Sequence, residues 1–165
     1  MNDLLPNLIE ALREELKQYG EMLALLDQQQ DLVMQRQTSE LLSSVATINE
    51  QTGIISAARH EREQRQRHLA RLLELSNDAG FAAIMPRLPA DYRPLVEALV
   101  QENNELLVRV QQRARQNHLL LNHAVELMQH LINAIVPGAS PKTYDDSGRV
   151  PSTTVPQHSL YEAVG

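Results

Sequence analysis

Two long stretches of the chain carry apolar residues at heptad spacing, which keeps them on one side of a helix. The first advances in steps of four and three, broken only by Gln30, and the second in steps of seven. This heptad pattern is typical of helices that pack side by side, and it differs from the strict alternation of a half-buried strand. It predicts helices over residues 3–34 and 91–135. The rows consist of Leu5, Ile9, Leu12, Leu16, Tyr19, Leu23, Leu26 and Val33 in the first stretch, and Val100, Leu107, Ala114, Leu121, Met128 and Ile135 in the second.

A further helix is predicted between these two, over residues 38–76. Thr38 can cap its start, and Gly80 is among the stop signals that follow it. Its apolar row is interrupted over residues 59–68, where charged and polar residues surround the helix on all sides. We expect that segment to be solvated and to bury no stripe of core residues.

The composition also favours helices, because Leu, Gln, Glu, Arg and Ala dominate and strands prefer aromatic and β-branched residues. The chain has one Phe, four Tyr and no Trp. We therefore predict an all-α fold, an elongated antiparallel three-helix bundle or coiled coil with a long third helix, over residues 1–136. Residues 137–165 hold four of the eight prolines and no core-forming period, so we expect a flexible Pro-rich tail there.

Several classes of function find no support in the sequence. Without cysteine there is no thiolate chemistry, and there is no Gly-x-Ser-x-Gly elbow or phosphate-binding glycine loop, so we expect no enzyme and no cofactor. His118, His123 and His130 do not follow a metal-ligand spacing. We expect them on the polar side of the helix, where His130 would interact with Glu126 four residues earlier. No signal peptide and no run of about 20 apolar residues is present, which predicts a cytoplasmic protein without direct membrane insertion.

The charge also disfavours nucleic acid as a partner, since the formal net charge is -6 and nucleic acid is a polyanion. A local basic segment exists over residues 59–71, with five arginines, but it lacks aromatic residues for base stacking. The first helix carries seven acidic residues that are available for internal ion pairs with it.

The lengths of the three helices suggest where a partner would bind. The helix over residues 91–135 is the longest, so its last turns would extend past its antiparallel neighbours and leave apolar residues uncovered. One candidate occupant is an amphipathic helix of another protein, which we favour; the others are a second copy of the chain, giving a homodimer, or the tail. The candidate residues are Leu120, Leu121, Ala124, Leu127, Met128, Leu131, Ile132 and Ile135.

Two asparagines interrupt an otherwise apolar row of the same helix. Asn103 and Asn117 share a seven-residue row with Val96, Val110 and further apolar residues. Polar residues at such positions commonly fix the register of helices or their oligomeric state. The alternative is that they form hydrogen bonds with a bound peptide.

The chain resembles a known family at its C-terminal end. Asn117 and Asn122 lie in the long third helix, and a Thr-Tyr-Asp-x-x-Gly motif follows over residues 143–148. Together with the three-helix layout, this resembles the FlgN-type flagellar export chaperones over residues 1–150. The resemblance implies a cytoplasmic protein that binds the C-terminal helices of hook-filament junction proteins. It would prevent their premature assembly and present them to the flagellar type III export apparatus.

The resemblance also implies roles for particular residues. The stretch from Asn117 to Ile135 would be the cargo-binding surface, which includes Asn117 and the candidate residues given above. Tyr144 would contact the export gate, and the export ATPase is a further candidate partner. A self-associating structural coiled-coil or adaptor protein is the alternative interpretation of the same sequence.

Overall fold

The structure is a computed structural model of the chain, and it describes residues 3–135. The predicted tail over residues 137–165, with Tyr144, lies outside the described residues. The chain divides into two compact units, Met1–His118 and Leu119–Gly165, and each is described by itself.

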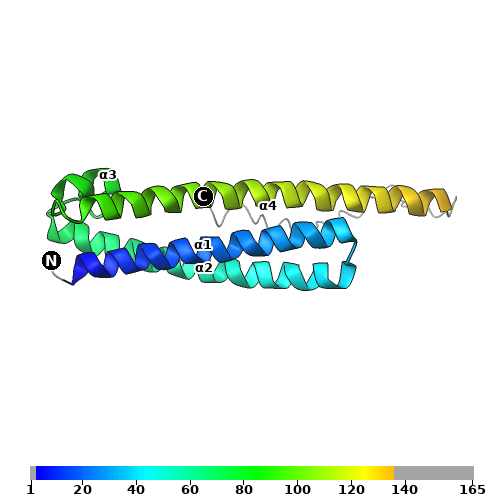
Figure 1. Ribbon diagram of the computed structural model, residues 1–165, viewed down its shortest axis with the longest axis horizontal. Coiled ribbons are helices and arrows are strands. Elements are labelled where there is room, and N and C mark those ends of the chain that lie inside the picture. The colour runs from blue at the N-terminus through cyan, green and yellow to red at the C-terminus, as the bar shows by residue number, and fades with distance from the viewer. Residues whose placement is uncertain (1–2, 136–165) are drawn as a thin grey trace, which may run out of the picture. The chain divides into compact units, whose positions relative to one another are not determined.

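The described chain is helical. Its elements are α1 (Leu4–Gln35), α2 (Thr38–Leu72), α3 (Phe81–Ile84), the 3-10 helix η1 (Met85–Arg87) and α4 (Arg93–Ile135) (Figure 1). α1, α2 and α4 pack against one another, and no strand occurs between residues 3 and 135. The predicted all-α fold with three long helices is confirmed.

Hydrogen bonds between side chains and neighbouring helices define the directions of the three helices in the first unit. Asn103 and Asn117 of α4 donate to the carbonyl oxygens of Leu12 and Leu26 of α1, so the residue numbers of both helices rise together. α1 and α4 are therefore parallel. α2 runs antiparallel to both, as required by its short connection to α1.

α1 and α2 are each followed by a residue whose backbone lies in the left-handed region. Arg36 has φ 57°, and its amide donates to the carbonyl oxygens of Leu32 and Val33, which ends α1 and allows α2 to begin at Thr38. At the other end Glu74 has φ 56°. α2 consequently ends at Leu72, four residues earlier than the expected position 76, and Leu75 turns back to pack against the core.

The core of the first unit consists of two separate clusters. The first lies at the end where α1 and α4 begin and α2 ends, and the second lies further along the bundle. The first cluster contains Leu5, Leu8, Ile9, Leu12, Leu69, Ala70, Ile84, Leu88, Val96 and Leu99. The second contains Tyr19, Met22, Leu26, Ile48 and Val110.

The polar segment of α2 does not behave as expected. We predicted that residues 59–68 would be solvated on all sides, but several of their side chains are half-buried. The Nε of Arg62 donates to Oε2 of Glu15 on α1 at 2.9 Å, and Nε2 of Gln66 donates to the carbonyl oxygen of Ala79 at 2.9 Å. This part of α2 is held to its neighbours by charged and amide groups, which an apolar pattern does not reveal.

Candidate functional site

The second unit is described over residues 119–135, where α4 carries many exposed apolar side chains. We call this set the α4 apolar face. The exposed fractions of its residues lie between 53% and 70%, and Val125 and Leu119 belong to it although the sequence analysis did not select them individually. The members are Leu119, Val125, Leu127, Met128, Leu131, Ile132 and Ile135.

One seven-residue row of α4 changes its environment along the helix. Val96 and Val110 are buried in the first unit, whereas Ala124 and Leu131, at later positions of the same row, are exposed in the second. The pattern that buries side chains in the bundle thus continues where they are uncovered. Large exposed apolar side chains gathered on one stretch of helix in this way are typical of interaction sites.

The residues that the sequence suggested for cargo binding differ in their solvent exposure. Leu127, Met128, Leu131, Ile132 and Ile135 belong to the α4 apolar face, Ala124 is exposed, and Leu120 and Leu121 are half-buried. All of these eight stay candidates for contact with a partner.

Asn117 differs from the other candidates, because it is buried inside the first unit with an exposed fraction of 2%. Its Nδ2 donates to the carbonyl oxygen of Leu26 at 2.7 Å and to Oε1 of Gln29 at 3.1 Å. Its side chain is therefore engaged with α1 and holds the packing of α4 on α1, and the role in cargo binding that the resemblance implies for it stays a prediction.

Asn103 repeats this arrangement two heptads earlier. Its Nδ2 donates to the carbonyl oxygen of Leu12 at 3.0 Å and to that of Leu99 at 2.9 Å. In both asparagines the buried Oδ1 has no hydrogen-bond partner among the described residues. The two asparagines thus define one register between α1 and α4, as polar residues on heptad rows commonly do.

A buried charged group of the first unit lies between its two apolar clusters. Glu15 is 3% exposed, and its carboxylate accepts hydrogen bonds from Arg62 and from the hydroxyl of Tyr19 at 3.0 Å. Burial, and then the charge of Glu15, raise the pKa of the Tyr19 hydroxyl well above its ordinary range. Nε2 of Gln51 adds a bond to Oε1 of Gln18 at 2.8 Å.

The arginines of the basic segment are engaged within the chain. Besides Arg62, which binds Glu15 of α1, three form ion pairs along α2 with Glu61 or Glu63, and Arg71 donates to Oδ1 of Asn77. These pairs neutralise most of the positive charge that a phosphate-binding face would need.

The described residues offer little for metal chemistry. Between residues 3 and 135 no group of three His, Cys, Asp or Glu side chains is placed to hold a metal ion. His123 lies 3.5 Å from a carboxylate oxygen of Glu126, both at the exposed surface. In the same part of the chain, no helix has the length and apolar character needed to cross a bilayer.

The fold and the exposed residues together define the class of the protein, an all-helical bundle with uncovered apolar side chains at the end of α4. A family model described as FlgN protein matches residues 1–152, and the chain belongs to that family. No curated protein and no solved structure matches the chain. The family membership defines a flagellar export chaperone in general, whose partners are flagellar proteins.

Proposed function

We propose that the protein binds the C-terminal amphipathic helices of hook-filament junction proteins on the α4 apolar face. The observation that carries the proposal is the exposure of Leu127, Leu131 and Ile135, which are 70%, 55% and 69% exposed. A cargo helix that lays its own apolar stripe on these residues would remove both surfaces from water. Each Å² of apolar area buried in this way contributes about 25 cal/mol.

The same contact would explain how the chaperone acts. Apolar helices that polymerise in the filament would be covered before export, so premature assembly is prevented. The cargo helix orders on binding, and the entropy lost in ordering it keeps the affinity moderate and favours release. Holding and release in this scheme need no catalytic residue and no cofactor.

Delivery to the flagellar type III export apparatus is the second part of the proposal. Tyr144 would contact the export gate, with the export ATPase as a further partner, and the complex would form in the cytoplasm. Substituting Tyr144→Ala should leave the dissociation constant for cargo unchanged and reduce the amount of cargo exported. An equal loss of binding and export would place Tyr144 in the cargo site instead.

Isothermal titration calorimetry with purified C-terminal helices of junction proteins tests the binding surface. The L127D/L131D double variant should weaken binding at least tenfold, because two buried charges would replace two apolar contacts. The matched control is V108D, since Val108 is also an exposed apolar residue of α4 but lies in the first unit. Unchanged binding by L127D/L131D, or an equal loss in V108D, would contradict the proposal.

Self-association through the same face is the competing function, because a second copy of α4 would also cover it. Sedimentation of the protein alone distinguishes the two. A 1:1 complex with cargo helices and a monomer without them support the chaperone. A concentration-dependent dimer that L127D/L131D makes monomeric, with no binding of the cargo helices, would establish the structural coiled coil.

A further inference from the structure

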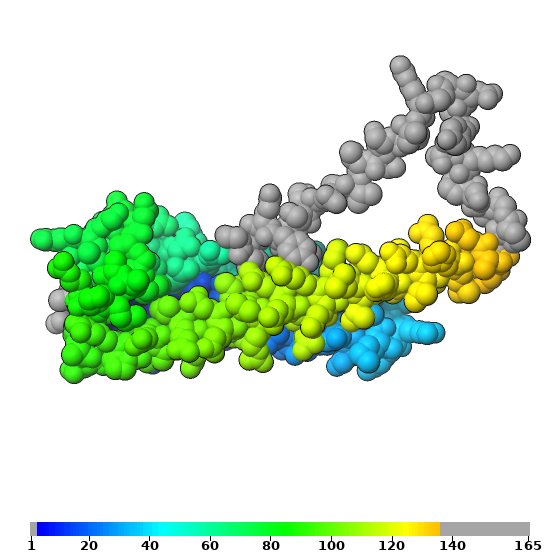
Figure 2. All heavy atoms as spheres, turned by 90° about the horizontal axis from the view of Figure 1, so that it is seen from above, coloured from blue at the N-terminus to red at the C-terminus, as the bar shows by residue number. Residues whose placement is uncertain are grey.

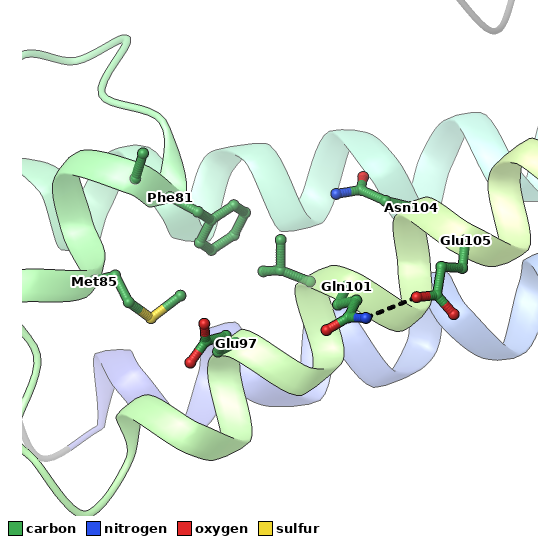
Figure 3. Close-up of a pocket in the computed structure, with 8 residues that line it drawn as sticks. Phe81, Met85, Glu97, Gln101, Asn104 and Glu105 are labelled. Carbon is green, nitrogen blue, oxygen red and sulfur yellow. Dashed lines mark hydrogen bonds between the residues drawn. The ribbon is translucent and has the colours of Figure 1, made fainter.

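A second surface, within the first unit, has the features of a docking site. α3 and the start of η1 lie against the first half of α4 and leave a hollow of about 440 Å³ between them (Figure 3). The side chains of Phe81 and Met85 point toward α4, which closes the hollow with Val100. In the space-filling view this region lies at the end of the first unit where α4 begins (Figure 2).

The floor of the hollow is apolar and fixed. Phe81, Met85 and Val100 pack on one side against the first core cluster and line the hollow on the other. The segment that carries Phe81 and Met85 is anchored by Ile84 and Leu88, whose side chains are fully buried. A preformed apolar floor of this kind binds a partner without a large cost of ordering.

Three hydrogen bonds also hold this part of the chain in place. Arg93, at the start of α4, donates from its guanidinium to the carbonyl oxygens of Pro86 and Leu88, each at 2.8 Å. Nε2 of Gln66 on α2 binds the carbonyl oxygen of Ala79. The walls of the hollow are therefore tied to α2 and α4.

The rim of the hollow is acidic. Glu97 and Glu105 line it from α4, and Gln101 between them donates to Oε1 of Glu105 at 2.8 Å (Figure 3). Among residues 3–135 neither carboxylate has an ion-pair partner within 4 Å. Eight positions on a helix separate them by about 12 Å. Arg93, four residues before Glu97, is occupied by the carbonyl groups of Pro86 and Leu88. Arg109, four residues after Glu105, forms no ion pair with Glu105 within 4 Å.

We propose that this hollow is a docking site for a cationic amphipathic helix of a partner protein, with a bulky apolar side chain over Phe81, Met85 and Val100. Lysine or arginine side chains about 12 Å apart on that helix pair with Glu97 and Glu105. The acidic rim repels nucleic acid and anionic lipid, which leaves a basic protein segment as the occupant. The site is independent of the α4 apolar face and of the cargo proposed for it.

The methionines of the chain allow the site to be observed directly. Met85 lines the hollow, Met128 lies on the α4 apolar face, Met22 is in the core and Met34 is exposed at the end of α1. In NMR spectra of protein labelled with ¹³C-methyl methionine, the signal of each of these four methyl groups therefore reports binding at one of these places. The probe is a Leu/Lys amphipathic helix of about 18 residues, or five turns. A Leu/Glu helix with the same leucine positions is the control peptide.

The expected result is a saturable shift of the Met85 methyl signal with the Leu/Lys helix and none with the Leu/Glu helix. The shift should weaken at high salt, because exposed charges are screened. In the E97K/E105K variant the dissociation constant reported by Met85 should rise about tenfold. The matched control E50K/E102K makes the same change in net charge at exposed positions outside the hollow, and it should bind almost as the native chain does.

Four results would overturn the proposal. The Met85 signal could stay in place while only Met128 shifts, or it could shift equally with both peptides. E50K/E102K could weaken binding as much as E97K/E105K, which would reduce the effect to net charge. A Met85 shift that depends on protein concentration without peptide would make a second copy the occupant. Circular dichroism confirms that each variant is folded, which is expected because all four glutamates are exposed.

Discussion

At the scale of single residues, the buried pair of Glu15 and Arg62 is the most consequential interaction of the bundle. The side chains of Arg62 and Glu15 are 16% and 4% exposed, and the pair lies where the apolar row of α2 is interrupted. Removing one member of a buried pair leaves an uncompensated charge, whereas replacing both by apolar residues can be neutral. We therefore expect the pair to contribute to which helices pack together more than to net stability.

A double-mutant cycle tests this role. Glu15→Leu should lower the free energy of unfolding by about 3 kcal/mol, and Glu15→Leu with Arg62→Leu should recover most of that loss. Urea unfolding followed by circular dichroism measures both. The control is Arg13→Ala, which breaks the exposed pair with Glu10 and should cost less than about 1 kcal/mol. Additive losses in the double variant would contradict the interpretation.

Tyr19, beside this pair, should make the stability of the bundle depend on alkaline pH. In the unfolded chain its hydroxyl ionises near its ordinary pKa of 10.0, but burial and then Glu15 keep it protonated in the folded chain at higher pH. The folded state thus binds the proton more tightly, and its stabilisation is fully present below pH 10 and is lost above it. The slope reaches about 1.4 kcal/mol per pH unit.

The measurement compares urea unfolding of the native chain and of Tyr19→Phe from about pH 8 to about pH 11. At about pH 8 the variant should be slightly less stable than the native chain, because one buried hydrogen bond is absent. As the pH rises, its free energy of unfolding should fall less than that of the native chain. Parallel curves for the two proteins would mean that Tyr19 ionises normally in the folded chain.

At the scale of elements, the sequence predicts α1 and α4 well and α2 poorly. α4 carries a continuous apolar row, and only Gln30 interrupts that of α1, so the period of both helices is visible without knowledge of the partners. α2 buries only Ile48, Gln51, Leu69 and Ala70, and much of its attachment comes from Arg62 and Gln66. The partners of such polar side chains depend on the tertiary arrangement, so periodicity alone could not place residues 59–68 against α1.

The asparagines of α4 permit a prediction about packing between elements. Replacing both Asn103 and Asn117 by Leu removes two buried carbonyl oxygens without hydrogen-bond partners and adds apolar area. The free energy of unfolding should rise by about 1 to 2 kcal/mol. The register between α1 and α4 should become less specific, because the bonds to Leu12 and Leu26 are lost.

Unfolding curves and sedimentation measure the two effects, and the expected result is a more stable protein that populates additional oligomers. Asn104→Leu is the matched control, since Asn104 is the exposed neighbour of Asn103 on the same helix. It should change neither stability nor oligomeric state appreciably. A destabilised double variant that stays a single species would show that the asparagines contribute stability and no specificity.

At the scale of the whole molecule, the two candidate surfaces differ in how far the sequence could reveal them. Five residues of the α4 apolar face were predictable, because they lie in the apolar last turns of a helix that is longer than its neighbours. The hollow between α3 and α4 was not predictable from the sequence, since Phe81 and Met85 lie in a segment that was expected to be a loop with one short turn of helix. Only the folded chain brings them beside Glu97 and Glu105.

The division of the chain into two units predicts that one heptad row responds to mutation in two ways. Val110 and Leu131 lie three heptads apart on the same row of α4, the first 8% and the second 55% exposed. Val110→Asp buries an unpaired charge in the second core cluster and should cost at least about 3 kcal/mol. Leu131→Asp should change the free energy of unfolding by less than about 0.5 kcal/mol, because an exposed site tolerates a charge. Thermal unfolding of both variants at a concentration where the native chain is monomeric makes the comparison, and a similar loss in both would mean that Leu131 is covered in solution.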